Sequence, residues 1–367
     1  MQGFQKQESD LLNCLEFNLG SGLVLGPVCL APCLATLRQS RCASWRKRVL
    51  QRPTSWSALE FWPNSLPWTW KLVTARNLSR NRQLKSSFVN DWIQLGKLRI
   101  QALSTPAAIL CCWLADGMRL KWSTATHLAI GLTLMSFASA VLNQVVEVEL
   151  DKKMKRTANR PLPAGRVSVS TAQWVGWFTG IAGAAWLWLA LNPLTAWLGI
   201  VMLGLYVFVY TPLKGVTELN TVVGAVPGAL PLLVGWAAAG NGLDIFAGIL
   251  FAILFLWQLP HFIAIAWIYR EDYARAGMKM LPSADETGAF SARQGAYWAL
   301  TLLVASLLPT VLGFANRTYF YAALTLGIGF LASVLHFGLK RTDARARVLL
   351  WASLIYLPLL LLALWLS

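Results

Sequence analysis

Charge is scarce in this chain. Only 13% of its 367 residues are Asp, Glu, Lys or Arg, whereas 56% are hydrophobic and 19 are tryptophan. Soluble globular domains rarely have that composition, so we interpret the chain as an integral membrane protein. Its 32 basic residues outnumber its 16 acidic ones. We attribute this excess to loops on the inner side of a membrane and to anionic lipid, because no nucleic-acid-binding motif is present.

Cysteine is also infrequent. The six cysteines are Cys14, Cys29, Cys33, Cys42, Cys111 and Cys112. They lack paired CxxC spacing with histidine partners, which disfavours a zinc site or a disulfide framework. We expect them to be packing residues. His127 and His336 have no motif around them, so we interpret them as structural too.

Long apolar windows dominate the sequence after about residue 100, each near the roughly 20 residues that cross a bilayer as a helix. The windows are 100–117, 126–146, 171–191, 194–212, 221–239, 243–268, 294–315, 319–338 and 347–366. The division between the third and the fourth depends on Asn192 and Pro193. The connections after even-numbered windows carry fifteen Lys and Arg against three in the opposite ones. This predicts about nine spans, with the N-terminus and the even connections on the cytoplasmic or matrix side and the C-terminus across the membrane.

Residues 1–90 differ from the predicted membrane domain at 91–367. They are basic and irregular, and their apolar run LVLGPVCLAPCLATL is too short to span and contains Pro27 and Pro32. Three interpretations stay open for this segment: a mitochondrial transit peptide, a basic arm at the membrane surface, or upstream sequence wrongly joined to the reading frame.

The densest cluster of charge is NQVVEVELDKKMKRTANRPL, residues 143–162. Asn143, Glu147 and Asp151 are spaced i, i+4 and i+8, so a helix places all three side chains on one face. Two stacked carboxylates beside an amide oxygen suit Mg²⁺. The basic residues that follow within reach of a phosphate are Lys155, Arg156 and Arg160. The alternative is that these charges solvate the end of a helix.

A second group of candidates follows the fourth window. Tyr210 and Lys214 are one helical turn apart, and Asn220 and Thr221 open the next window. Lys214 could bind phosphate, or it could be a lysine that reaches from a helix end to the membrane surface. The glycines and prolines of GAVPGALPLLVGW permit close approach, either of a neighbouring helix or of a flat ligand.

His261 and Asp272 form a third group. They are eleven residues apart, so they share a helix face if the helix continues past Pro260. They would then face the acidic residues at 143–151 across a cavity. An ionisable residue within a span marks a functional site, although a lone histidine there can also be a packing residue.

The amino-acid sequences of these motifs resemble those of a known family. The pattern N-x3-E-x3-D followed by KKMKRTANRPLPAGRVS closely resembles the first acidic motif of the intramembrane aromatic prenyltransferases, the UbiA superfamily. The RTANRPL ending is similar to the protohaem IX farnesyltransferases, as are KLRIQALST, YTPLKGVTELNTVVGAVPGALPLLVGW and WQLPHFIAIAWIYREDYARAGMKMLP. The resemblance covers roughly residues 90–366. It implies an all-α, UbiA-type bundle of about nine transmembrane helices with a central cavity.

The resemblance also implies a reaction. Farnesyl diphosphate would be joined to a vinyl group of haem b to give haem O, and the lipid bilayer, haem A synthase or a terminal oxidase would be the partners. The implied roles are as follows: Asn143, Glu147 and Asp151 bind Mg²⁺ and act in catalysis with His261 and Asp272; Lys155, Arg156, Arg160, Lys214 and Arg270 bind diphosphate; Tyr210, Asn220, Thr221 and Tyr273 line the substrate cavity. Relatives commonly have LKR where this chain has Leu213, Lys214 and Gly215, so one expected cation is missing.

Other functions stay open. A related enzyme would use the same residues to prenylate a quinone precursor or a chlorin. A secondary transporter would place acids near the midplane and show internal repeats, which are not evident here. A structural or assembly protein would leave the charged clusters unexplained. We expect the plasma membrane of a bacterium, with the acidic motifs on the cytoplasmic side, and the mitochondrial inner membrane as the alternative.

Overall fold

The computed structural model describes residues 88–119, 121–240, 242–285 and 287–367. Within these ranges all regular structure is helical and no strand occurs. The interpretations of residues 1–87, four cysteines included, lie outside the described residues. Cys111 and Cys112 are buried and carry free thiols, as expected for packing residues.

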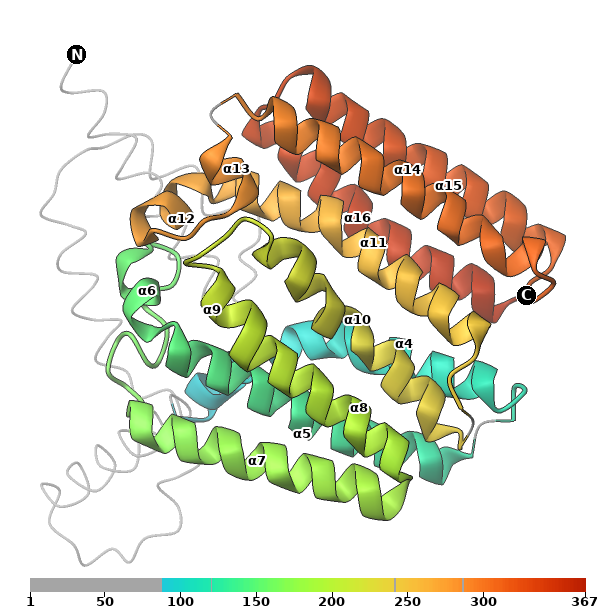
Figure 1. The fold of residues 1–367 in the computed structure, drawn as a ribbon, viewed down its shortest axis with the longest axis horizontal. Coiled ribbons are helices and arrows are strands. Elements are labelled where there is room, and N and C mark those ends of the chain that lie inside the picture. The colour runs from blue at the N-terminus through green and yellow to red at the C-terminus, as the bar shows by residue number, and fades with distance from the viewer. Residues whose placement is uncertain (1–87, 120, 241, 286) are drawn as a thin grey trace, which may run out of the picture. The chain divides into compact units, whose positions relative to one another are not determined.

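Long helices make up the bundle, and Figure 1 shows them crossing the molecule side by side. The long helices are α4 (Leu98–Ala115), α5 (Trp122–Val146), α7 (Val169–Ala190), α8 (Pro193–Gly204), α10 (Asn220–Ala238), α11 (Ile245–Ile268), α14 (Ala289–Val311), α15 (Arg317–Leu339) and α16 (Asp343–Trp365). The short elements are α6 (Val148–Lys153), the π-helix η3 (Leu205–Tyr210), α9 (Thr211–Leu213), α12 (Arg270–Ala276) and α13 (Leu281–Ala284).

Each of the nine predicted windows contains a helix, but the number of spans is not confirmed. In the described part of the chain, seven helical segments are long and apolar enough to cross a membrane. The two long helices outside this set are α4, which contributes a shorter apolar helix at Gln101–Ala115, and α7, whose mean hydropathy is lowered by small and polar residues. The prediction of an all-α protein that crosses the membrane several times is confirmed.

Short polar side chains begin several of the long helices. Ser168 accepts a hydrogen bond from the backbone N–H of Thr171 at the start of α7, and Asn192 accepts one from Thr195 at the start of α8. Such caps satisfy backbone donors that the first turn of a helix leaves free. Because Pro193 follows at the first position of α8, the predicted break between the third and fourth windows is confirmed.

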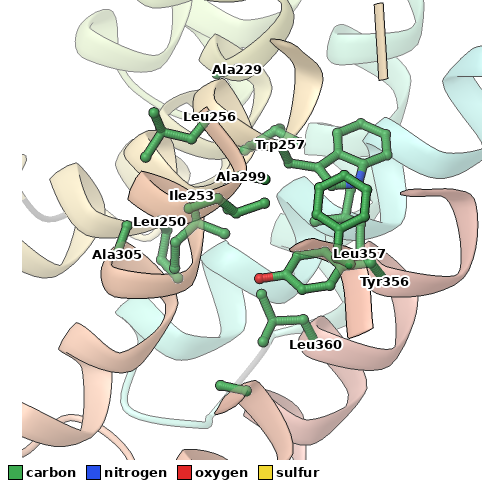
Figure 2. Packing of buried hydrophobic residues seen from close by; sticks show 14 of the residues in the cluster. Ala229, Leu250, Ile253, Leu256, Trp257, Ala299, Ala305, Tyr356, Leu357 and Leu360 are labelled. Atoms are coloured by element: carbon green, nitrogen blue, oxygen red, sulfur yellow. The ribbon is translucent and has the colours of Figure 1, made fainter. Parts of the chain in front are cut away.

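Helix α10 lies between the two halves of the bundle. On one side it packs with α11, and its Ala229 and Trp236 belong to the same buried cluster as Trp257, Tyr356 and Leu360 (Figure 2). On the other side it packs with α5 and α8 through residues such as Leu230 and Val234. A helix buried on both sides needs apolar residues around its whole circumference, and α10 has them.

The glycines of α10 allow its neighbours to approach closely. A Cβ atom added to Gly235 would overlap the backbone of Ala108 in α4, and one added to Gly224 would overlap the ring of Tyr210. At Gly228 it would overlap a side chain of α11. Of the two sequence-based interpretations of this segment, close packing therefore accounts for these three glycines.

Candidate active site

The polar residues predicted from the sequence gather at one end of the bundle. The short helices α6, α9, α12 and α13 all lie at that end in Figure 1, together with the C-terminal end of α5 and the start of α10. The C-terminus of the chain lies at the other end. Segments far apart in sequence thus contribute to one charged region.

The acidic face at Asn143, Glu147 and Asp151 forms as the spacing predicts. Helix α5 ends at Val146 and α6 begins at Val148, but the backbone hydrogen bonds from Glu147 to Asn143 and from Asp151 to Glu147 continue the i to i−4 pattern across the junction. The three residues are 0%, 4% and 0% exposed. Buried carboxylates are costly unless they are paired, so the interpretation that they merely solvate a helix end is wrong.

Glu147 is paired with Lys214, which follows α9. The ammonium nitrogen lies 2.5 Å from Oε1 of Glu147 and 4.4 Å from the centre of the Tyr210 ring. Burial alone would raise the pKa of Glu147, but the positive charges of Lys214 and Lys97 outweigh it and hold that pKa below its usual value. Burial would lower the pKa of Lys214, but the surrounding Tyr210 and Glu147 raise it. Both groups therefore stay charged.

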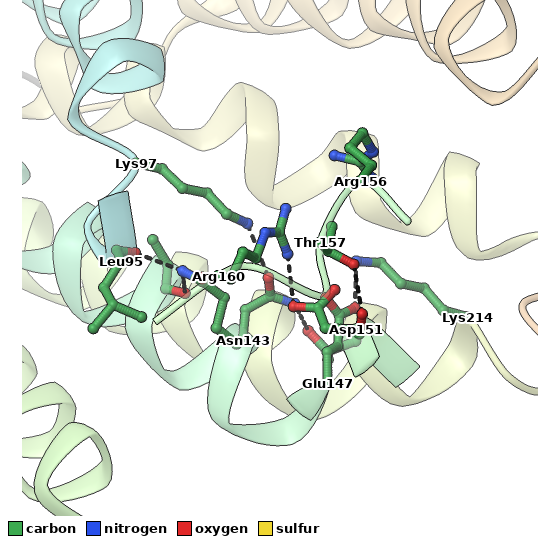
Figure 3. Close-up of polar contacts among 12 residues, drawn as sticks. Leu95, Lys97, Asn143, Glu147, Asp151, Arg156, Thr157, Arg160 and Lys214 are labelled. Carbon is green, nitrogen blue, oxygen red and sulfur yellow. Dashed lines mark hydrogen bonds and ion pairs between the residues drawn. The ribbon is translucent and has the colours of Figure 1, made fainter. Parts of the chain in front are cut away.

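Asp151 is paired with Arg160 from the loop after α6. The guanidinium Nη1 donates to Oδ2 at 2.7 Å (Figure 3). The loop is fixed because the Thr157 hydroxyl donates to the backbone carbonyl of Asp151 at 2.9 Å. The other carboxylate oxygen, Oδ1, is buried and has no hydrogen-bond partner among the described residues.

Asn143 is held from two sides. Its Nδ2 donates to the hydroxyl of Thr211 at 3.0 Å, and its Oδ1 accepts from the ammonium of Lys97 at 3.0 Å. In Figure 3 the side chains of Lys97 and Lys214 reach the acidic face from opposite sides of the view. Each of the three oxygen-bearing side chains of this face thus has a cation of its own.

These residues fit a magnesium ion. A buried carboxylate oxygen without a partner, as at Asp151, is costly unless something completes its coordination. In the part of the chain that the structure describes, no three His, Cys, Asp or Glu side chains cluster together, so the donor set is two carboxylates and the Asn143 amide. Mg²⁺ usually binds one or two carboxylates and keeps several waters, so this set is sufficient.

Asp272 holds the loop that carries the basic residues. It accepts the backbone N–H groups of Lys155 and Arg156, each at 3.4 Å, and the guanidinium of Arg275 at 2.8 Å. Burial would raise the pKa of Asp272, but these hydrogen bonds lower it. The Arg156 guanidinium lies 4.8 Å from the centre of the Tyr269 ring. The Asp272 carboxylate therefore holds the predicted phosphate-binding loop by accepting hydrogen bonds from backbone N–H groups of that loop.

Tyr273 lies in the same contact. Its hydroxyl accepts a hydrogen bond from Nη2 of Arg156 at 3.5 Å, and its ring lies 5.9 Å from the guanidinium. The structure thus places Tyr273 against the basic loop. Its predicted contact with substrate stays a prediction.

His261 has neighbours that the sequence did not indicate. Its Nδ1 lies 2.7 Å from the hydroxyl of Ser353 in α16, and its ring stacks 4.9 Å from Trp257. The Ser353 hydroxyl has one proton and also lies 2.6 Å from the backbone carbonyl of Leu350, an arrangement that fits the tautomer with a proton on Nδ1 of His261. In that tautomer Nε2 carries the lone pair.

The chain is helical from His261 to Asp272 apart from one residue. Helix α11 continues past Pro260 to Ile268, α12 begins at Arg270, and backbone hydrogen bonds from Tyr269 to Ile265 and from Tyr273 to Tyr269 continue the i to i−4 pattern across the junction. The two side chains contact different segments, His261 at Ser353 and Asp272 at the loop after α6. Their shared helix face stays a prediction.

Arg270 points toward α16. Its Nη1 donates to Oδ1 of Asp343 and to the backbone carbonyl of Trp267, both at 2.7 Å. These contacts fasten the end of α11 to the start of α16. The structure does not bring Arg270 to the acidic face, so we remove it from the predicted diphosphate-binding set.

Asn220 anchors the start of α10. It is fully buried, and its Nδ2 donates to the carbonyls of Thr217 and Lys279 at 2.6 and 2.7 Å. The hydroxyl of Thr221 lies 3.4 Å from the Asn220 oxygen. These contacts give Asn220 a structural role that accounts for its burial without a substrate.

A small apolar cavity lies between α4, α10, α11, α15 and α16. Ala107, Leu254, Tyr319 and Leu360 are among its lining residues. It shares no residue with the acidic face, so it does not correspond to the predicted substrate cavity. That cavity stays a prediction.

Sequence reasoning missed three residues of this region: Lys97, Thr211 and Ser353. Lys97 is the first residue of KLRIQALST, a motif noted for its resemblance but given no role. Thr211 and Ser353 carried no signal, because a hydroxyl within an apolar helix is common. Each is recognised only by its contact with Asn143 or His261.

Comparison with known proteins identifies the family. The model of the UbiA prenyltransferase family matches residues 104–365. The chain belongs to that family. Among curated relatives, the protoheme IX farnesyltransferase of Solibacter usitatus is 43% identical over 281 residues, covering 74% of this chain and 96% of that protein. The one of Koribacter versatilis is 40% identical over 285 residues, covering 75% and 92%. The resemblance predicted from the motifs is confirmed.

Solved structures share the fold. A digeranylgeranylglyceryl phosphate synthase superposes with a TM-score of 0.64 at 16% identity, covering 76% of this chain and 97% of that one. A UbiA homologue from Archaeoglobus fulgidus, bound to DMAPP and Mg²⁺, gives 0.53 at 14% identity and covers 75% and 99%. At these identities the likeness shows the fold alone.

Proposed function

We propose that this chain transfers the farnesyl group of farnesyl diphosphate to a vinyl group of haem b and so produces haem O. Relatives at 35–43% identity that carry the name protoheme IX farnesyltransferase support this reaction. The observation that carries the proposal is the buried face of Asn143, Glu147 and Asp151, each paired with a cation and with one carboxylate oxygen unsatisfied.

The residues of this face would bind and orient the diphosphate. Asn143, Glu147 and Asp151 would hold Mg²⁺, which when bound offsets the negative charge that develops on a departing diphosphate. Lys214 and Arg160 already lie at this face, and Lys155 and Arg156 belong to the loop beside it. Cations fixed where charge develops lower the barrier to breaking the allylic carbon–oxygen bond. The haem vinyl group would then attack the allylic cation, and water would add to the cation left on the haem side chain and lose a proton, which leaves a hydroxyl group.

The other polar residues would position these groups. Asp272 would keep the loop of Arg156 in place, since it binds the loop through two backbone N–H groups. His261 would present Nε2 with its lone pair, because its Nδ1 proton is directed to Ser353. Tyr210 packs against Lys214 and would restrict that ammonium to the acidic face.

The excess of Lys and Arg in alternate connections supports an orientation with the acidic face on the cytoplasmic side. We propose the bacterial plasma membrane as the location. Farnesyl diphosphate has a charged diphosphate and an apolar chain. A site at this membrane surface would accommodate the diphosphate on the aqueous side and the chain on the lipid side. Haem A synthase or a terminal oxidase would receive the product.

The test is expression in a host that lacks its own haem O synthase, followed by haem extraction and chromatography. The proposal predicts haem O in the extract and its loss when Mg²⁺ is removed by chelation. A prenylated quinone precursor or chlorin without haem O would instead support the related-enzyme alternative. Correctly inserted protein with none of these products would refute the proposed prenyl transfer.

A further inference from the structure

The turn that carries Lys97 is held in an uncommon conformation. Lys97 precedes α4 with φ 49° and ψ 39°, in the left-handed region that residues other than glycine rarely adopt. Such backbone conformations cost about 1–3 kcal/mol and persist where the surrounding structure enforces them. An observed outlier of this kind is a reason to ask what the residue does.

Two buried glutamines enforce this conformation. Gln144, next to Asn143 in α5, donates to the carbonyl of Leu95 at 2.7 Å, and Gln101 of α4 donates to the carbonyl of Gly96 at 2.8 Å. Gly96 also lacks room for a Cβ atom, because the ring of Phe137 occupies that space. Packing and hydrogen bonds from two helices therefore fix the point from which the Lys97 side chain starts.

The ammonium of Lys97 contacts a neutral side chain. Its ammonium donates to Oδ1 of Asn143 at 3.0 Å, the one hydrogen bond that the described residues give it. The other two oxygen-bearing side chains of the acidic face have cations paired with carboxylates, at Lys214 and Arg160. An ammonium with three donors is poorly satisfied by one amide oxygen. The same oxygen is a proposed ligand of Mg²⁺, and an ammonium bound there opposes a second cation.

We propose, on the basis of the proposed prenyl transfer, that Lys97 is a further diphosphate-binding residue that occupies the Asn143 oxygen until the metal arrives. When Mg²⁺ binds Asn143, Glu147 and Asp151, the Lys97 ammonium moves from Asn143 to a phosphate oxygen of the substrate. A charge-assisted contact then replaces a contact with a neutral amide. The flexible four-carbon stem of lysine permits this movement without a change in the backbone.

This proposal predicts opposite effects on two ligands in one variant. In Lys97→Met, Mn²⁺ alone should bind about threefold or more tightly, because the competing charge is gone. Inorganic pyrophosphate in the presence of Mg²⁺ should bind about tenfold or more weakly, because a charged donor is lost. Mn²⁺ is followed by its electron paramagnetic resonance signal and pyrophosphate by calorimetry, both on the full chain in detergent.

Two further variants separate binding from folding. Lys97→Gly should show the same two effects with a melting temperature at or above that of the wild type, because glycine adopts the left-handed conformation without strain. Lys121→Met is the matched control: Lys121 is an exposed lysine that precedes the N-terminal end of α5, and both affinities should be unchanged.

These measurements distinguish a failure of the proposed function from a failure of the proposed role of Lys97. Wild-type protein that binds no pyrophosphate would refute the proposed function, and the role of Lys97 with it. Wild-type protein that binds pyrophosphate while Lys97→Met and Lys97→Gly bind it equally well would overturn the role of Lys97 alone. Metal affinity that stays the same or falls in both variants would likewise overturn it.

Discussion

Arg160 donates to one oxygen of Asp151 at 2.7 Å, while the second oxygen of that carboxylate lies buried with no partner in the part of the chain that the structure describes. One carboxylate thus serves two purposes. Its paired oxygen fixes the guanidinium, and its other oxygen is available to the proposed metal. The local sequence makes this possible, because Thr157 ties the intervening loop to the backbone of Asp151.

Asp151→Asn should abolish haem O formation, with a loss of about 100-fold or more, because removal of the charge weakens both the metal site and the hold on Arg160. The substitution preserves shape, so the protein should still insert and melt cooperatively. Product formation and Mn²⁺ binding by the purified variant are the measurements. Glu149→Gln is the control, since Glu149 lies on the same helix but is exposed and pairs with Lys152. Normal turnover in Asp151→Asn would contradict the metal assignment.

Asp272→Asn should loosen the loop that follows α6. The neutral amide accepts the N–H groups of Lys155 and Arg156 less strongly than a carboxylate does. Hydrogen–deuterium exchange should therefore speed up in the loop, and the KM for farnesyl diphosphate should rise about three- to tenfold. Glu271→Gln, an exposed neighbour, should change neither value. Unchanged exchange would exclude the proposed role of Asp272.

The contact between Asp272 and the loop after α6 has a predictable pH dependence. The folded state holds the pKa of Asp272 below its ordinary value of 3.8, so its contribution to stability is complete above that value and is lost as pH falls through the lower, folded-state pKa. Loop protection in the wild type should hence be constant between about pH 5 and 8 and fall only in stronger acid. A loss of protection near neutral pH would show that another group controls the loop.

Much of this site was predictable from spacing alone. Asn143, Glu147 and Asp151 share a face because α5 and α6 continue one helical pattern, and that pattern is local. The break at Asn192 was predictable for the same reason, since a cap and a proline act on the residues next to them. Local periodicity and capping can be identified directly from neighbouring residues in a sequence.

The residues that were missed or misplaced depend on contacts between distant segments. Lys97 reaches Asn143 across 46 positions, and His261 reaches Ser353 across 92. The family resemblance assigns Arg270 to diphosphate, whereas its guanidinium pairs with Asp343 at the start of α16. Sequence spacing does not reveal which of several possible partners a charged side chain will meet.

Gly215→Arg should supply the cation that the family resemblance leads us to expect at this position. A Cβ atom there would meet only the carbonyl oxygen of Pro212 at 3.9 Å, so the substitution should fold normally. A second cation beside Lys214 should lower the KM for farnesyl diphosphate about two- to fivefold through added phosphate contacts. Gly215→Gln controls for size without charge. A KM that rises in the arginine variant alone would show that the extra charge is misplaced.

Ser353→Ala should reduce turnover without affecting the metal site. Loss of the hydroxyl leaves Nδ1 of His261 without an acceptor, so the ring loses its fixed orientation and tautomer. We expect a fall in kcat of about three- to tenfold with unchanged Mn²⁺ affinity. Ser306→Ala removes a comparable buried hydroxyl, bonded to Tyr356, and should leave kcat unaltered. Equal effects in the two variants would reduce the role of Ser353 to packing.

The close approach of α4 and α10 gives a prediction about stability alone. A methyl group at Gly235 would overlap the backbone of Ala108, which cannot move aside without shifting α4. Gly235→Ala should therefore destabilise the protein by about 1–3 kcal/mol and lower its melting temperature in detergent.

Gly248→Ala is the matched substitution, because Gly248 is exposed on α11 and a methyl group there meets no atom within 4 Å. Alanine favours the helix over glycine by about 0.5–1 kcal/mol, so this variant should melt at or above the wild-type temperature. If both variants shift in the same direction, helix propensity rather than the contact with Ala108 determines the effect at Gly235.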